Sequence, residues 1–229
     1  MYKVVLFDLD GTLTDPMLGI TRCVQHALRH FGIEEDIEKL TKFIGPPLID
    51  SFMEFYNFTE DQARVATDVY RERFAPIGKF ENEIYEGIPE LLSALKEKGM
   101  LLAVASSKPE LFVEEILEHF SIREYFDIVV GALMDETRTK KDEVLMEALA
   151  QIEERLSTDE SVEAFENFDE IKKDIAMVGD RKFDVAGANH FGIAGVGVRY
   201  GYADPGELEA ENPAFIADTV DELRNYLLA

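Results

Sequence analysis

The sequence predicts an α/β fold: a doubly wound parallel sheet in a Rossmann-like core, with an inserted α-helical cap domain. Two observations predict the core. Short apolar runs without strict alternation are typical of buried parallel strands, and segments with helical spacing separate them. Strands that alternate with helices indicate βαβ units. A third observation predicts the insertion, because one long stretch after the first apolar run shows helical spacing alone.

The expected strands are five apolar runs that end at small or acidic residues. They lie at 4–7, 101–105, 128–130, 175–178 and 193–198. Apolar faces with helical spacing follow at 91–95, 111–120 and 144–152. Gly99 stands after the first of these faces as a helix C-cap.

The expected insertion covers residues 16–81 and forms a helical cap domain, which leaves 1–15 and 82–229 for the core. Within it, Thr59 followed by Gln62 resembles a capping box at the start of a helix. An acidic stretch at 153–170 is expected to be a solvated helix extension or an excursion between helix and strand.

Composition excludes several classes of protein. The 229 residues include 47 acidic and 23 basic side chains, a formal net charge of −24, which argues against binding to nucleic acid or to anionic lipid surfaces. Cys23 is the single cysteine, so no intrachain disulfide or thiolate metal cluster is possible. No apolar run approaches the roughly 20 residues that span a bilayer. We expect a cytoplasmic protein without a membrane or nucleic-acid partner, either a monomer or a homodimer.

Acidic residues follow two of the expected strands. Asp8 and Asp10 close the first strand, and a turn at Gly11 can return the second carboxylate to the same site. Asp180 follows a later strand, and Asp184 comes four residues on. Ligands of open α/β sheets bind beyond the carboxyl ends of the strands. Carboxylates that meet there need a cation, and an oxygen-only cluster suits Mg²⁺.

Hydroxyl and amine groups complete a predicted phosphate site. Ser106 and Ser107 follow a strand and precede a helix initiated by Pro109, which is a position for a phosphate cradle. Lys140 and Lys141 precede the next helix, where an amine can neutralise an attacking carboxylate and a phosphoryl group. The single sequence leaves both lysines open for this role.

These segments resemble the four motifs of the haloacid dehalogenase (HAD) superfamily of phosphatases. Asp8-Leu9-Asp10-Gly11-Thr12 resembles the first motif, Ser106 the second, Lys141 the third, and Gly179-Asp180 with Asp184 the fourth. The cap segment 43–48, Phe-Ile-Gly-Pro-Pro-Leu, is similar to the phosphoglycolate phosphatase-like branch, whose members are often labelled predicted phosphatase or 5'-nucleotidase. The resemblance covers essentially the whole chain.

The resemblance implies a Mg²⁺-dependent phosphatase that hydrolyses small phosphate monoesters, of phosphoglycolate or nucleotide type, through an aspartyl-phosphate. Asp8 would be the nucleophile and Asp10 the general acid and base, and Ser106 and Lys141 would complete the catalytic set. Mg²⁺ would be held by Asp8, Asp10, Asp180 and Asp184. The residues expected to contact substrate are Gly11, Thr12, Ser107, Arg22, Phe43 and Gly45.

Three alternative functions share part of this pattern. A sugar phosphomutase of the beta-phosphoglucomutase type would share every motif, and substrate tests alone separate it. A dehalogenase of the superfamily lacks an acid at the second aspartate, so Asp10 argues against it. A non-catalytic phosphate-binding protein would be expected to have lost Asp8 or Asp10, and the chain carries both.

Overall fold

A parallel sheet of six strands forms the core, in the order β5-β4-β1-β6-β7-β8. The computed structural model describes residues 2–135, 137–158 and 167–229. The α/β prediction is confirmed, and every expected strand is present; β8 was not predicted. The strands are β1 (Val4–Phe7), β4 (Leu101–Pro109), β5 (Ile128–Ala132), β6 (Ile175–Gly179), β7 (Ala194–Val198) and β8 (Phe215–Ala217).

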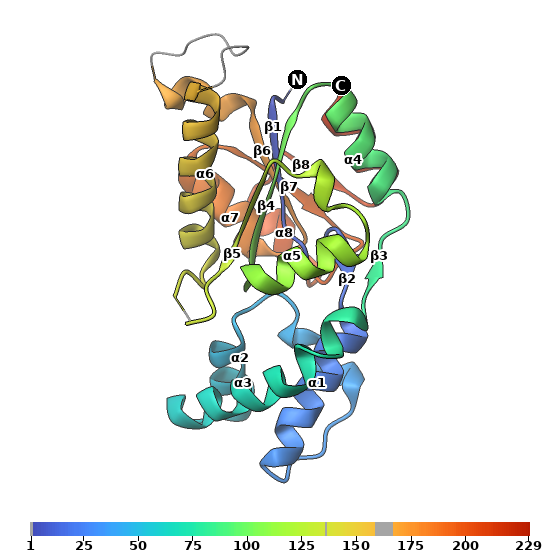
Figure 1. Ribbon diagram of the computed structural model, residues 1–229, viewed down its shortest axis with the longest axis vertical. Helices are drawn as coiled ribbons and strands as arrows, with labels where there is room; N and C mark the ends of the chain where they lie inside the picture. Colours follow the sequence, from blue (N-terminus) through green and yellow to red (C-terminus); the bar gives the residue numbers. More distant parts are fainter. Residues whose placement is uncertain (1, 136, 159–166) are drawn as a thin grey trace.

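Helices cover both faces of this sheet, and the side chains of β1 alternate between the two apolar clusters that they form with it. Val5 and Phe7 pack with α4 (Ile88–Glu97), α5 (Glu110–His119) and α9 (Val220–Leu228). Val4 and Leu6 pack with α6 (Lys141–Thr158) and α7 (Lys182–Phe191). Figure 1 shows α6 to the left of the sheet and α4 to its right. A short helix, α8 (Glu207–Ala210), follows β7.

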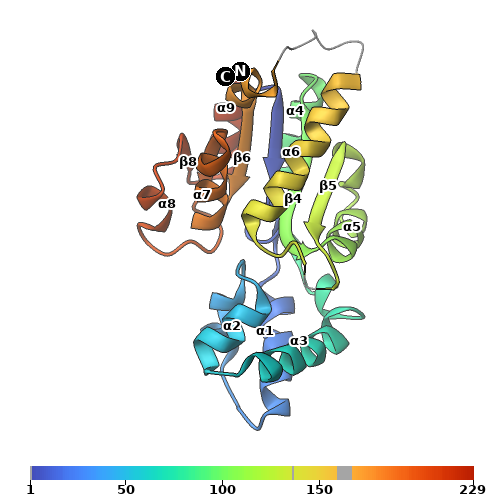
Figure 2. The same cartoon turned by 90° about the vertical axis from the view of Figure 1, so that its left-hand side faces the viewer.

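A group of helices lies beyond one end of the sheet (Figures 1 and 2). It consists of α1 (Met17–His30), α2 (Leu48–Tyr56), α3 (Glu60–Phe74) and the 3₁₀ turns η1 (Ile37–Phe43) and η2 (Gly78–Phe80). These elements share their own apolar cluster, which includes Leu28, Phe43 and Phe52. The predicted capping box is confirmed: Thr59 Oγ1 accepts from the Gln62 amide, and the Gln62 side chain accepts from the Thr59 amide.

The helical group joins the core through an antiparallel ribbon of β2 (Thr14–Asp15) and β3 (Glu83–Ile84). The proposed domain limits, 16–81 for the cap with 1–15 and 82–229 for the core, stay a prediction. Of the acidic stretch 153–170, the first six residues continue α6, and 159–166 lie outside the described residues. Within the described ranges no helix combines the length and apolar character needed to cross a bilayer.

Candidate active site

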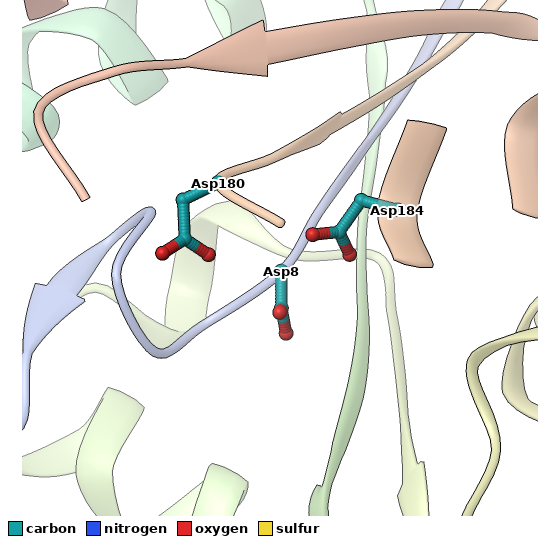
Figure 3. Close-up of side chains that lie close together, drawn as sticks. All are labelled: Asp8, Asp180 and Asp184. Carbon is teal, nitrogen blue, oxygen red and sulfur yellow. The ribbon is translucent and has the colours of Figure 1, made fainter. Parts of the chain in front are cut away.

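Three aspartates meet at the carboxyl end of the central strands (Figure 3). Asp8 follows β1, Asp180 follows β6, and Asp184 lies in the first turn of α7. Strands β1 and β6 are parallel neighbours with Phe7 opposite Val178, so both chains leave the sheet at the same edge. One carboxylate oxygen from each aspartate lies within 4.8 Å of the others, and all three residues are buried.

A tight turn after β1 makes room for this cluster. Gly11 has a φ of +77°, which favours glycine, and a Cβ added there would lie 2.1 Å from Asp180 Oδ2. The same Oδ2 accepts a hydrogen bond of 2.7 Å from the Tyr202 amide. The other oxygen, Asp180 Oδ1, is buried and has no hydrogen-bond partner among the described residues. A buried carboxylate oxygen without a donor is an unsatisfied acceptor that a cation would fill.

The electrostatics of the cluster also favour a cation. Burial, with the Asp184 and Asp8 charges beside it, raises the pKa of Asp180 well above its usual range. Burial raises the pKa of Asp184 to about 6, although Lys141 opposes the shift. Both shifts express the cost of several negative charges in a desolvated site. An all-oxygen donor set with this surplus of charge fits Mg²⁺.

Lys141, the first residue of α6, is the buried cation of the cluster. Its Nζ lies 3.2 Å from Asp8 Oδ2 and 2.8 Å from Asp184 Oδ1, and it donates a hydrogen bond to the Ala105 carbonyl. Burial disfavours the ammonium, but the carboxylates of Asp184 and Asp8 outweigh it and raise the pKa of Lys141. The neighbouring Lys140 is exposed. Of the two lysines left open by the sequence, the structure therefore brings Lys141 to Asp8.

Asp10 lies close to a lysine whose role the sequence did not indicate. Lys108 Nζ is 2.7 Å from Asp10 Oδ2, and both side chains are about nine-tenths buried. Burial raises the pKa of Asp10, and the charge of Lys108 opposes the shift. Ser106 is buried nearby and accepts from the Lys108 amide. Strand β4 extends to Pro109 with an irregular register after Ala105, and Ser106 and Lys108 are buried in it while Ser107 is half-buried.

Two cavities adjoin Asp8. The first also contains Asp10, Ser106, Ser107 and Gly45 in its lining. Its outer wall is apolar and comes largely from the helical group; it includes Ile20, Phe43, Leu48, Tyr70, Phe74 and, from α5, Phe112. The second cavity lies on the side of Lys141 and Asp184 and is more charged, with Lys140, Asp142, Arg181 and His190 in its lining. Of these two cavities, only the first contains Asp10 in its lining.

Three expected substrate contacts line neither of these two cavities. Arg22 pairs with Glu81 at 2.7 Å, and its side chain is 45% exposed. Thr12 is fully buried, and Gly11 lies against Asp180. Phe43 reaches the first cavity with only 1% of its surface exposed, because its ring packs on Phe52 and Phe55.

Residues 5–198 match the family described as haloacid dehalogenase-like hydrolase. A 5'-nucleotidase from Pseudomonas aeruginosa is 43% identical over 227 residues, covering 99% of this chain and 96% of the relative. The tyrosine-protein kinase PtkA of Mycobacterium tuberculosis is 35% identical over 230 residues, covering 98% and 72%. The crystal structure of a predicted phosphatase from Clostridium acetobutylicum is 43% identical, with a TM-score of 0.89 and coverage of 100% and 99%.

Proposed function

The chain belongs to the haloacid dehalogenase-like hydrolase family and is a phosphatase, and from that premise we propose that it hydrolyses small phosphate monoesters through an aspartyl-phosphate on Asp8. One observation carries the proposal. Asp8 faces a cavity that also contains Asp10 and Ser106, while the Lys141 ammonium lies 3.2 Å from Asp8 Oδ2. This arrangement supports the proposal because it offers groups suited to act as nucleophile, proton donor, phosphate-binding hydroxyl and charge-balancing amine.

The proposed reaction has two displacements at phosphorus. In the first, an Asp8 carboxylate oxygen bonds to phosphorus, the bond to the ester oxygen breaks, and Asp10 gives its proton to the departing alkoxide. In the second, water attacks the aspartyl-phosphate, gives a proton to Asp10, and releases inorganic phosphate from Asp8. The Leu9 amide donates to Asp8 Oδ1 at 2.8 Å, which supports a fixed orientation of the nucleophile during both steps.

The cationic groups would offset the charge of the phosphoryl group. Mg²⁺, held by Asp8, Asp180 and Asp184 with the Asp10 carbonyl, would neutralise phosphoryl oxygens when bound. The Lys141 ammonium would attract both the Asp8 carboxylate and the oxygens of the transferred phosphoryl group. Lys108 would keep the Asp10 carboxyl directed at the first cavity.

The apolar first cavity supports a nucleotide-type substrate more than phosphoglycolate. A nucleoside offers planar and apolar surface to the rings of Tyr70, Phe74 and Phe112, whereas glycolate offers a second carboxylate. Lys108 lines this cavity but pairs with Asp10. Arg71 of α3 also lines it, so the preference for a nucleoside rests on the aromatic wall and not on a lack of cations.

The test is a screen of phosphate monoesters with Mg²⁺, in which nucleoside monophosphates, sugar phosphates and phosphoglycolate are compared by kcat/KM. Asp8→Asn should abolish turnover, and mass spectrometry after acid trapping should find phosphate on Asp8 of the wild type. Asp218→Asn, an exposed surface change, is the matched control and should retain activity. Phosphate trapped on Ser106 would contradict the mechanism. Isomerised sugar phosphate in place of inorganic phosphate would establish the phosphomutase alternative.

A further inference from the structure

Arg181 joins the acidic cluster to the helical group. It follows Asp180 directly, and its side chain is only 12% exposed. Its Nη1 donates a hydrogen bond of 2.7 Å to the carbonyl of Ile44, a residue 137 positions earlier in the chain. Its own backbone amide donates to Asp184 Oδ2 at 3.0 Å. The proposed chemistry uses the aspartates on either side of Arg181 and leaves the guanidinium itself without a role.

The segment that Arg181 holds is the loop 44–47, between η1 and α2. Figure 2 shows this loop rising from the helical group toward the core. Gly45 and Pro47 line both cavities beside Asp8. Gly45 has a φ of +105°, and a Cβ there would lie 3.1 Å from Arg181 Cγ. The loop backbone is therefore seated directly on the Arg181 side chain, and a side chain at position 45 would crowd it and would have to adopt a φ of +105°.

Glu207 fixes the guanidinium from the side of the core. Its Oε1 accepts 2.8 Å and 2.9 Å hydrogen bonds from Arg181 Nε and the Lys182 amide, and its Oε2 accepts from the Asp204 amide at 3.1 Å. Burial disfavours the carboxylate, but the bonds from Arg181 and the two amides hold the pKa of Glu207 below its usual range. An arginine that is bound on one side to a buried carboxylate has few orientations left, so its remaining N–H donors point in a fixed direction, here toward the Ile44 carbonyl.

The covalent connections of the helical group lie elsewhere. They are the strands β2 and β3, which Figure 1 places on the right of the junction, whereas α2 and its preceding loop lie to the left. Other contacts between the helical group and the core lie at α5, where Lys79 pairs with Glu115 and Phe74 packs on Phe112. The bond from Arg181 to Ile44 adds a polar contact at the loop that precedes α2, and it restricts movement of that loop relative to the core.

We propose that Arg181 is a positioning residue that holds the loop 44–47 over Asp8, with Glu207 fixing the guanidinium. The inference rests on the proposed function, because the loop matters for turnover only if leaving groups bind in the first cavity. Arg181 lies between Asp180 and Asp184, so its bond to Ile44 fixes the position of the loop relative to both aspartates. The leaving-group chamber and the phosphoryl site are thereby held in one fixed relation.

The test compares Arg181→Ala and Arg181→Lys with Arg199→Ala in the full-length protein. Arg199 also pairs with two carboxylates, Glu209 and Asp218, but it is 45% exposed and makes no bond to the cap, so its removal should leave activity within about twofold. For Arg181→Ala we expect kcat/KM for the best nucleoside monophosphate to fall at least tenfold, chiefly through KM. Acetyl phosphate, whose leaving group is too small to need the loop, should change less than threefold. Arg181→Lys should restore part of the loss, since one donor remains.

Hydrogen–deuterium exchange supplies a readout independent of activity. Peptides covering residues 43–52 should exchange faster in Arg181→Ala than in wild type or Arg199→Ala, while peptides from β1 and β6 should be unchanged. An equal loss for both substrates, or unchanged exchange at 43–52, would overturn the proposal. If the wild type hydrolysed no phosphate ester, the proposed function would fail, and the exchange measurement would still decide whether Arg181 holds the loop.

Discussion

Protonation of the Asp184 carboxyl should stabilise the folded state of the metal-free protein. Folding raises the pKa of this buried carboxyl from 3.8 to about 6, so the folded state binds the proton more tightly than the unfolded state. The resulting stability is fully present below pH 3.8 and is lost as the pH rises through about 6. In chelator, acidification from pH 7.5 to 5 should therefore increase the free energy of unfolding.

The magnitude follows from the same shift. The full difference between the two pKa values corresponds to about 3 kcal/mol. Because pH 5 lies only one unit below the folded pKa, about 1.4 kcal/mol of this appears between pH 7.5 and 5. For a protein of this size that is about 3–6 °C in Tm. Mg²⁺ at 100 times its Kd should instead add about 2.7 kcal/mol at pH 7.5, because it occupies the site that the proton would otherwise neutralise.

The assay is urea unfolding of wild type, Asp184→Asn and Asp218→Asn in chelator at both pH values. The chain has a net charge of −24, so acidification also relieves general repulsion, and the exposed Asp218→Asn variant carries that background unchanged. Asp184→Asn should gain about 1.4 kcal/mol less than Asp218→Asn on acidification. Equal gains in the two variants would refute the reasoning, as would a wild type that loses stability between pH 7.5 and 5.

Four further predictions concern the metal, the turn at Gly11 and the two residues that flank the loop 44–47. Chelation should abolish phosphatase activity and Mg²⁺ should restore it, with Zn²⁺ a poor substitute at an all-oxygen site; full turnover in a verified metal-free preparation would contradict this. Gly11→Ala should remove activity, and it should lower Tm by more than Gly99→Ala does. Both glycines have a φ of +77°, but only at Gly11 would a Cβ meet the Asp180 carboxylate. Equal losses of Tm in the two variants would exclude this collision. Leu48→Ala should shift kcat/KM between phosphate esters by about 1–3 kcal/mol, and a uniform fall for every ester would exclude a role in specificity. Phe43→Ala should mainly destabilise the cap, by about 3–5 kcal/mol, since its side chain is 1% exposed; a thermal scan separates the two effects.

The sheet was predictable because parallel strands are buried on both faces and are therefore apolar throughout. β1 and β6 are fully buried, and their runs stand out in the sequence. β8 was missed because it has three residues at the edge of the sheet, too few for a pattern. The prediction for β4 ended at Ala105, whereas the extended backbone continues through the polar residues to Pro109.

The candidate site was partly predictable for the same topological reason. Asp8 and Asp180 follow neighbouring strands, so the sheet alone brings them together. The choice between adjacent lysines depends on where α6 begins, and helix boundaries are poorly determined by sequence. The bond from Arg181 to Ile44 joins residues 137 apart, and no local pattern carries that information. The outward direction of Arg22 likewise depends on how α1 packs within the helical group.

The position of β1 in the sheet also has a consequence for how the protein is made. Val4 pairs with Leu101 on one side and with Ile175 on the other. The strand that precedes Asp8 therefore cannot pair until residues much later in the chain have been synthesised. Helices α1 and α3 contact each other over shorter separations and can assemble earlier, since local contacts form fastest. Until Asp184 has left the ribosome, Asp8 lacks its electrostatic surroundings. A nascent or truncated chain that ends before α7 can therefore form the contact between α1 and α3 but lacks Asp184 of the acidic cluster.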